Sequence, residues 1–530
     1  MKSNSGWSMD NHYDVIIAGA GAAGAIIASR LTEDADRSVL VLDAGPDFPN
    51  LESLPEEIRY AYGRDRNLWD RAFGAGTMFG WGYRARATDH APNIFVPRGK
   101  IVGGSSAVNA QIFLRGMPED YDSWAQAGSD GWSHQDLLPF FCMNETDLDY
   151  GDKAYHGDAG PIRARRFKHA ELNTEHRAFY AAARDAGYAD CPDHNAPDTT
   201  GVGPLPLNNA EGIRWSTAIG YLNPARSRPN LTIQANTHVC RVLFDGKKAT
   251  GLQVEQNGTP GEVHGGEILL CGGSIGSPHV LLLSGVGPAA HLEEMGVPTV
   301  CDLPGVGQNL REHPQIGVTL RAKEQYLTEG TEPRLQMGLR YTATGSSLRN
   351  DMLIIPASFA TEEGYYTTAH SKPLGFYLVG SLYLAASAGD LTLASIDPHQ
   401  QPILNYNYLD DPFDAQRLRE SIRIIIDLLE HEGLKELVAE RLAPTDAQLT
   451  TDAALDEWIR TNVTTSHHVS STCKMGTDPL AVVDGYGKVH GLENLRVADA
   501  AIMPDCVRAN TNITSMVIGE RIDDFKRRGH

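Results

Sequence analysis

Three glycines near the start of the chain have the spacing of a nucleotide-binding turn. Segment 19–24 reads Gly-Ala-Gly-Ala-Ala-Gly and directly follows the apolar run 15–18. In this pattern Gly19 allows a sharp turn, Gly21 lets a pyrophosphate approach the backbone, and Gly24 lets the next helix pack closely on the strands. The phosphates would lie at the N-terminus of that helix, where free N–H groups and the helix dipole favour negative charge. The sequence therefore predicts binding of a nucleotide that carries a pyrophosphate.

A carboxylate follows this turn at the distance expected for a group that binds an adenosine ribose. The run 38–42 predicts a second buried strand, and it ends in Asp43. A glycine pattern by itself is a weak signal. Two flanking strands and the following acid make it specific, against the alternative of a glycine-rich turn that binds no ligand.

Two adjacent histidines, His467 and His468, are candidates for proton transfer, since neutral imidazole titrates near working pH. The alternative for a lone histidine is a hydrogen-bonded core residue. His313, between Glu312 and Pro314, is expected mainly to fix a turn at a domain boundary, with contact to the pocket as the alternative. No cluster of Cys, His and Asp has the spacing of metal ligands, so we expect no metal.

A second glycine-rich loop precedes an asparagine. Residues 98–109 contain a cation, two adjacent glycines, two serines and Asn109. The backbone N–H groups of such a loop can line an anionic or electron-rich ligand. Alternatively, Ser105 or Ser106 could simply cap a helix.

Length and composition limit the class of protein. A chain of 530 residues predicts two or three domains, and 41% hydrophobic with 21% charged residues is typical of soluble globular proteins. The net charge of −21 argues against nucleic acid and anionic membranes as partners. No run reaches the roughly 20 apolar residues needed for an integral membrane segment.

Segment 1–12 is polar, and seven scattered cysteines form no C-x-x-C pair, so we expect a reduced, cytoplasmic enzyme.

Hydrophobic periodicity predicts the elements that must position these residues. Runs 238–244, 249–255 and 262–270 predict three strands, followed by a helix over 274–284. Four later runs predict an antiparallel sheet that could roof a pocket: 352–355, 376–383, 391–396 and 403–408. We also expect an amphipathic helix over 414–432, a strand within 497–503 that carries Asp499 at its end, and a last helix over 515–525.

Together these motifs resemble the glucose-methanol-choline (GMC) family of flavin-dependent oxidoreductases, and the resemblance covers nearly the whole chain. It is carried by 19–24 with Asp43, by 99–109, by 273–278 with 284–287, and by 468–512. The resemblance implies an α/β fold, α+β overall: a Rossmann-like FAD-binding domain and a substrate domain built on an antiparallel sheet. The expected boundaries are 10–160, 205–315 and 462–530 for the first domain and 161–204 with 316–461 for the second.

The resemblance also assigns roles to individual residues. His468 would be the catalytic base, with Asn510 as its partner, donating a hydrogen bond to the developing alkoxide. His467 could line the pocket, contact the flavin or orient His468. The residues expected to bind FAD are Gly19, Gly21, Ala22, Ala23, Gly24, Asp43, Ala44, Trp69, Val102, Asn109, Ala110, Val239, His467, Asp499, Ala500 and Asn512. Some members attach FAD through a histidine before the asparagine; here that residue is Val108, so noncovalent FAD is expected.

The substrate is expected to be a small neutral primary alcohol, aromatic or furanic. Choline-specific members place a carboxylate after the His-Pro step, where this chain has Gln315, and a histidine where it has Ile355. Segment 145–157 looks like that of hydroxymethylfurfural and aryl-alcohol oxidases. The electron acceptor could be O₂, a quinone or a protein, and the enzyme a monomer or dimer. Three alternatives remain: a hydroxynitrile-lyase-like member without net redox chemistry, a choline-type dehydrogenase, and a noncatalytic flavin-binding protein.

Overall fold

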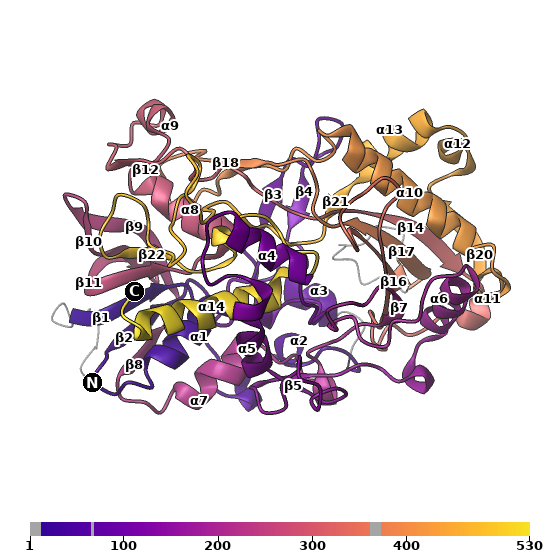
Figure 1. The fold of residues 1–530 in the computed structure, drawn as a ribbon, viewed down its shortest axis with the longest axis horizontal. Helices are drawn as coiled ribbons and strands as arrows, with labels where there is room; N and C mark the ends of the chain where they lie inside the picture. The colour runs from indigo at the N-terminus through magenta and orange to yellow at the C-terminus, as the bar shows by residue number, and fades with distance from the viewer. Residues whose placement is uncertain (1–11, 65–67, 361–372) are drawn as a thin grey trace.

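A computed structural model describes residues 12–64, 68–360 and 373–530. The polar segment before residue 12, with the expected domain start at residue 10, lies outside these ranges. Figure 1 shows two sheets at opposite ends of the longest axis, with loops and short helices between them. The first described strand, β1 (His12–Ala18), and the C-terminal end lie at the same side of the molecule (Figure 1).

The first sheet is the nucleotide-binding one. It has seven strands. Six follow the order β8-β2-β1-β11-β10-β9, and the seventh, β22, also pairs with β11. Parallel pairing joins β1 (His12–Ala18), β2 (Val39–Leu42), β8 (Leu231–Gln234), β11 (Thr259–Leu270) and β22 (Leu495–Val497). The antiparallel strands β9 (Thr237–Asp245) and β10 (Lys248–Gln256) complete it.

The register of this sheet brings four chain segments to one edge. Ala18 is opposite both Leu42 and Leu270, and Leu270 is opposite Val497. The residues that follow these strand ends, among them Gly19 and Asp43, therefore lie together, as expected at the carboxyl edge of a parallel sheet.

The helices α1 (Ala22–Leu31) and α14 (Thr511–Arg527) pack together beside this sheet (Figure 1). Their close contact depends on Gly519, where an added Cβ would lie 2.8 Å from the Ala23 carbonyl oxygen. The C-terminal helix is thereby fixed directly against the first helix of the chain.

The second sheet is antiparallel, with seven strands in the order β20-β14-β17-β16-β15-β7 and β21 paired to β14. Its strands are β7 (Gly201–Pro204), β14 (Pro314–Ala322), β15 (Met337–Tyr341), β16 (Met352–Ala360), β17 (Gly375–Leu382), β20 (Val438–Ala443) and β21 (Thr464–Thr465). Helix α10 (Pro412–Leu428) packs on β17, where a Cβ on Gly380 would lie 2.4 Å from Ser421 Oγ.

Shorter elements connect and cover the sheets. The helices are α2 (Glu56–Arg59), α3 (Leu68–Phe73), α4 (Pro118–Gln126), α5 (His134–Asn144), α6 (Thr174–Asp185), α7 (Asn223–Ala225), α8 (Gly273–Leu283), α9 (Ala289–Glu294), α11 (Glu432–Leu437), α12 (Asp446–Leu449) and α13 (Asp452–Asn462). The short strand pairs are β3 (Tyr83–Ala85) with β4 (Ile94–Val96), β5 (Glu145–Asp147) with β6 (Ile162–Ala164), β12 (Val286–Gly287) with β13 (Cys301–Asp302), and β18 (Asp390–Thr392) with β19 (Ile403–Asn405).

Four predicted elements differ from the structure. The runs 391–396 and 403–408 contain β18 and β19, but these pair only with each other and do not join the roof sheet. The helix predicted over 414–432 ends at Leu428, because the His431 side chain caps a new helix, α11. The final helix begins at Thr511, four residues before the predicted start.

The strand predicted within 497–503 is also wrong in its position. The strand β22 ends at Val497, and Ala500–Ile502 form one turn of 3₁₀ helix. The Asp499 side chain accepts a hydrogen bond from the Ala501 N–H, and this cap favours the helical turn. Asp499 still lies beyond the end of a strand, as predicted, because that strand comes before it.

The predicted domain boundaries stay a prediction. The structure adds that β7, within 161–204, pairs in the second sheet, and that β21 pairs there too although it lies within 462–530. In the part of the chain that the structure describes, no helix is both long enough and apolar enough to span a bilayer. All seven cysteines are described, and each is a free thiol.

Candidate active site

One cavity of about 460 Å³ links the two sheets. Its wall includes Gly19 and Asp43 at the carboxyl edge of the first sheet and Val379 and Ser381 of β17 in the second. The cavity wall thus starts where a nucleotide is expected and ends under the antiparallel sheet.

Asp43 holds the nucleotide end of the cavity in shape. Its carboxylate accepts hydrogen bonds from the Ala20 N–H at 3.0 Å and the Gly45 N–H at 2.8 Å. Burial raises the pKa of Asp43 to about 6, and these two N–H groups oppose that shift. The side chain therefore ties the first glycine turn to the end of β2.

Two glycine-rich turns meet at this end. The Gly103 N–H donates to the Ala20 carbonyl oxygen at 2.8 Å. A Cβ on Gly104, whose φ is +53°, would lie 2.7 Å from Gly21 Cα. Only glycine permits this approach. The loop 98–109 is thus not merely a helix cap, because it forms one wall of the cavity with segment 19–24.

Asp499 joins the N-terminus of α8 to the segment that follows β22. It accepts hydrogen bonds from Ser277 Oγ at 2.6 Å and the Gly273 N–H at 2.9 Å through one oxygen, and from the Ala501 N–H through the other. Burial raises its pKa, although these three donors oppose the shift. The carboxylate lies on the cavity wall.

The wall fits FAD. The atoms Ser274 Oγ, His279 Nε2 and Asn510 Oδ1 are buried at this wall without a hydrogen-bond partner in the protein. Buried polar atoms are normally paired, so these point to a polar ligand. The predicted FAD-binding residues on the wall are Gly19, Gly21, Ala22, Ala23, Asp43, Ala44, Trp69, Asn109, Ala110, Val239, His467, Asp499, Ala500 and Asn512.

Two predicted residues are not on the wall. Gly24 packs α1 onto the turn, since a Cβ there would lie 2.0 Å from the Gly19 carbonyl oxygen. The Val102 side chain is buried and its N–H donates to the Pro46 carbonyl oxygen, so its predicted contact with the flavin ring has no support from the cavity. Val108, where some relatives carry a histidine, does line the cavity.

The predicted catalytic pair is brought together. His468 Nε2 lies 3.0 Å from Asn510 Nδ2, and both residues line the cavity. An amide nitrogen is only a donor, so Nε2 accepts and is unprotonated. Burial, followed by His313, His467 and Arg98, lowers the pKa of His468 well below its ordinary range. The imidazole is therefore neutral, as a proton acceptor must be.

His313 is the main residue that the sequence interpretation missed. Its main expected role is to fix a turn, with contact to the pocket as the lesser alternative, but its Nδ1 lies 2.9 Å from His468 Nδ1. With Nε2 of His468 unprotonated, the proton sits on its Nδ1 and is donated to His313. The contact arises because Pro314 pairs with Thr465 across β14 and β21, which places two distant segments side by side. The motif Glu312-His313-Pro314 was the available signal.

His467 occupies a strained position on the cavity wall. Its φ is +69°, in the left-handed region, and its side chain is held at the wall. Burial and the nearby Arg98 lower the pKa of His467 to about 3. Non-glycine residues in this conformation cluster at functional sites.

Arg214 supports the Asn109 segment, and sequence reasoning did not single it out. Its fully buried guanidinium donates to the carbonyl oxygens of Glu57 at 2.7 Å, Ile58 at 2.9 Å and Asn109 at 3.1 Å. Burial lowers the pKa of Arg214 to about 9. This arginine therefore fixes the backbone of the wall behind Asn109.

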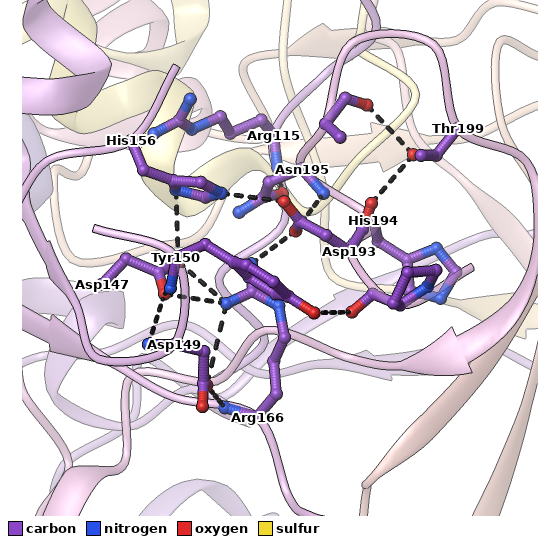
Figure 2. Close-up of polar contacts among 12 residues, drawn as sticks. Arg115, Asp147, Asp149, Tyr150, His156, Arg166, Asp193, His194, Asn195 and Thr199 are labelled. Atoms are coloured by element: carbon purple, nitrogen blue, oxygen red, sulfur yellow. Dashed lines mark hydrogen bonds and ion pairs between the residues drawn. The ribbon is translucent and has the colours of Figure 1, made fainter. Parts of the chain in front are cut away.

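Tertiary structure also gathers a donor set that the sequence did not reveal. One ligand-type atom from each of Glu145, Asp147 and His156 lies within 4.8 Å of the others. Figure 2 shows His156 and Arg166 joined to Asp147 and Asp193. The ring nitrogens of His156 lie 2.5 Å from Glu145 Oε1 and 2.9 Å from Asp193 Oδ2.

Two arginines complete this group. Arg115 lies 2.6 Å from Glu145, and Arg166 lies 2.8 Å from Asp147 and 2.5 Å from Asp193. Three carboxylates thus face two guanidinium groups and an imidazole that has a carboxylate at each nitrogen. The charges balance when His156 is protonated, so the group is an ion network, and the absence of a metal stays a prediction.

The sheet edge expected to bind a dinucleotide opens into a cavity, and a neutral histidine lies in this cavity under the antiparallel sheet. This arrangement is that of a flavin-dependent oxidoreductase. Models of the GMC oxidoreductase family match residues 13–315 and 385–519, and the chain belongs to this family. It is therefore an FAD-dependent alcohol oxidoreductase.

The chain is similar to known oxidoreductases over nearly its whole length. It is 37% identical to the oxygen-dependent choline dehydrogenase of Paraburkholderia phytofirmans, over 97% of this chain and 94% of that protein. The Escherichia coli K12 protein of the same name is 36% identical over 97% and 95%. Pyridoxine 4-oxidase from Mesorbium loti superposes with a TM-score of 0.89 at 27% identity, covering 98% of this chain and all of that one. A fungal aryl-alcohol oxidase at 23% identity, TM-score 0.79 and coverage of 98% and 99% shares the fold.

Proposed function

We propose that this enzyme oxidises a small uncharged primary alcohol, aromatic or furanic, to the aldehyde. The supporting observation is the distribution of charge on the cavity wall. Among the described wall residues the only carboxylates are Asp43 and Asp499, both at the nucleotide-binding edge. The cation Arg98 lies on the wall and lowers the pKa values of His467 and His468. A cationic substrate beside these histidines would therefore contact no carboxylate among the described wall residues.

The wall under the second sheet suits an apolar ring. It includes Leu335, Ile355, Ala357 and Val379. The Gln315 amide, at the position where choline-specific members would have a carboxylate, donates to the Thr465 carbonyl oxygen at 2.9 Å and accepts from Ser466 Oγ at 3.2 Å. Its polar atoms are committed to the protein, which favours an uncharged substrate.

His468 and Asn510 would divide the work on the hydroxyl group. Neutral His468 accepts the hydroxyl proton at Nε2. The single lone pair of Nε2 cannot hold the Asn510 N–H and the hydroxyl proton together, so Asn510 Nδ2 directs its hydrogen bond to the alcohol oxygen when the proton is transferred. Bound FAD supplies the hydride acceptor for the C–H bond. A positioned base of this kind contributes about 10²–10⁴ in rate.

A choline-type substrate is the second candidate, because the relatives from P. phytofirmans and E. coli are named choline dehydrogenases. In this chain a quaternary ammonium would depend on the faces of aromatic rings such as Trp69, since the wall offers no carboxylate there.

An anaerobic titration of the holoenzyme separates these functions. Rapid bleaching of the flavin by benzyl alcohol or hydroxymethylfurfural, with slow bleaching by choline, is the expected result. The opposite order would replace the proposal with the choline-type activity. Cyanohydrin cleavage without bleaching would indicate a lyase, and neither response would indicate a noncatalytic flavoprotein.

The remaining expectations concern partners and location. Admission of air after bleaching distinguishes O₂ from a quinone or protein acceptor, because only an oxidase is reoxidised fast with formation of peroxide. A reduced cytoplasmic location and a monomeric or dimeric state belong to the same proposal, and sedimentation of the purified holoenzyme tests the latter.

A further inference from the structure

A buried carboxylate that the mechanism above does not use lies behind the histidines. Glu312 is 4% exposed and is not part of the cavity wall. Its Oε1 accepts from the backbone N–H of His468 at 2.5 Å and from that of His313 at 3.0 Å. Its Oε2 accepts from Tyr408 Oη at 2.5 Å and from the Thr465 hydroxyl. Four donors converge on one carboxylate.

These bonds determine the shape of the histidine turn, residues 464–468. Thr465 Oγ1, which donates to Glu312, accepts the His467 N–H at 2.8 Å. Glu312 thus holds His468 directly and His467 through one hydroxyl. The left-handed conformation of His467 needs such support, because a strained backbone persists only where its surroundings over-determine it.

The same carboxylate is a member of this turn's hydrogen-bond network, through the His468 N–H and the Thr465 hydroxyl. The charged and titratable groups around His468 are His313 on the β14 side, His467 within the turn, Arg98 on the opposite wall, and Tyr383 and Cys506 from neighbouring segments. None of these is an anion when in its ordinary protonation state. Proton uptake by His468 creates a buried cation, and a buried charge without compensation is costly.

We propose that Glu312 is the positioning residue of the active site: it fixes the His313–His468 pair in register and compensates the positive charge that the pair gains. The proposal rests on the proposed function, in which His468 takes the proton of the alcohol. Glu312 touches neither substrate nor cofactor and acts through the two backbone N–H groups and through its charge.

Two substitutions separate position from charge. Glu312→Gln keeps the size and removes the charge; Glu312→Asp keeps the charge and shortens the side chain. Both are expected to lower the rate constant of anaerobic flavin reduction by at least about tenfold. Only Glu312→Gln is expected to shift the acid limb of the pH profile to lower pH, because the imidazolium loses its compensating charge.

Glu175→Gln is the matched control. Glu175 is also buried and hydrogen-bonded, to Ser358, but it is not among the groups that contact His313, His467 or His468, and it is not a residue of the cavity wall. It should leave the rate and the pH profile of flavin reduction unchanged. A Glu312→Gln enzyme with a wild-type rate, or with a lower rate and an unmoved acid limb, would overturn the proposal.

A third variant covers the case in which Glu312→Gln does not fold with FAD. Tyr408→Phe keeps the carboxylate but removes one donor from Oε2, and a rate at least about threefold lower with full FAD content is expected. A wild-type rate in Tyr408→Phe would then count against the proposal.

¹⁵N NMR of histidine-labelled holoenzyme makes the test independent of turnover. A changed tautomer signal of His468 in Glu312→Gln supports the positioning role even if no primary alcohol reduces the wild-type flavin. A wild-type flavin that no primary alcohol reduces would reject the proposed function. An unchanged His468 tautomer signal in Glu312→Gln would reject the positioning role.

Discussion

The His468 ring is engaged at both nitrogens, by Asn510 at Nε2 and by His313 at Nδ1. This arrangement fixes one tautomer and directs the unprotonated nitrogen to the side of the cavity that carries Asn510. At the residue scale, therefore, the function depends on a few neutral polar groups in a buried site, where each hydrogen bond is stronger than in water.

Replacement of His468 by Ala should lower the rate constant of flavin reduction at least about a hundredfold, because the proton acceptor is lost. FAD should stay bound, since Asp43 and the two glycine turns are unaffected. Stopped-flow reduction together with the absorbance ratio of flavin to protein measures both effects. Activity within a few fold of wild type would remove the base assignment.

The rate of flavin reduction should depend little on pH from neutral to alkaline solution. His468 must be neutral to accept a proton, and burial lowers its pKa well below the ordinary value of about 6.5. The rate should fall only when the pH drops below the pKa of an ordinary imidazole. An acid limb at or above about pH 6.5 in the anaerobic pH profile would contradict this prediction.

Replacement of Asp43 by Ala should weaken FAD retention. The carboxylate holds the Ala20 and Gly45 N–H groups, and its loss frees both turns as well as the expected ribose contact. Asp43→Asn, which keeps an acceptor, should lose less FAD. Fluorescence of released flavin during dilution and equilibrium dialysis gives the two dissociation constants, and equal retention in Asp43→Ala and wild type would refute the assignment.

At the element scale, the site depends on how closely two glycine turns approach each other. The first follows β1 and the second precedes Asn109, and they meet at Gly21 and Gly104. The strands and helices behind these turns are predictable from local pattern. The contact between the turns is a property of the packed sheet edge.

A methyl group at this contact should expel the cofactor. In Gly104→Ala the new Cβ would lie 2.7 Å from Gly21 Cα, so one turn must move. The expected result is purified protein that retains its fold by circular dichroism but contains little FAD. Gly246→Ala is the control, because Gly246 has a similar positive φ of +60° with no atom within 4 Å of its Cβ position. Gly104→Ala with as much FAD as Gly246→Ala would show that this contact does not control cofactor binding.

At the scale of the whole molecule, buried ion pairs join segments far apart in the sequence. The network around His156 links β5, through Glu145, to Arg115, which follows the Asn109 wall. It also links His156 to Asp193, which precedes β7 of the second sheet (Figure 2). Arg340 of β15 extends this link by donating to the carbonyl oxygens of His194, Arg115 and Arg508. The two sheets are thereby connected through charge as well as through apolar packing.

Replacement of His156 by Gln should destabilise the protein most at acid to neutral pH. Burial lowers the pKa of His156, but Asp193 and Glu145 outweigh that effect and raise it overall. A raised folded pKa gives stability that is fully present below the unfolded value of about 6.5 and is lost as the pH rises through the folded value. Removal of one partner of a buried ion pair costs about 3–5 kcal/mol.

Thermal unfolding from acid to alkaline pH checks this prediction. The difference in Tm between wild type and His156→Gln should shrink as the pH rises. His90→Gln, at an exposed histidine paired with Glu457, should change Tm little at any pH. A difference in Tm that is constant across the pH range would show that His156 is not held as an imidazolium.

The sequence by itself determined the nucleotide-binding turn, the acid after β2, the three-stranded return to the first sheet, the family and the pair His468 and Asn510. These features are encoded in short segments, where residue type and spacing dictate backbone conformation. The roles of His313 and Glu312, the contact of Gly104 with Gly21, and the His156 network were decided only by the tertiary structure. Each brings together groups from different segments, such as His313 and His468 across 155 residues, and contacts across such distances leave no periodic signal in the chain.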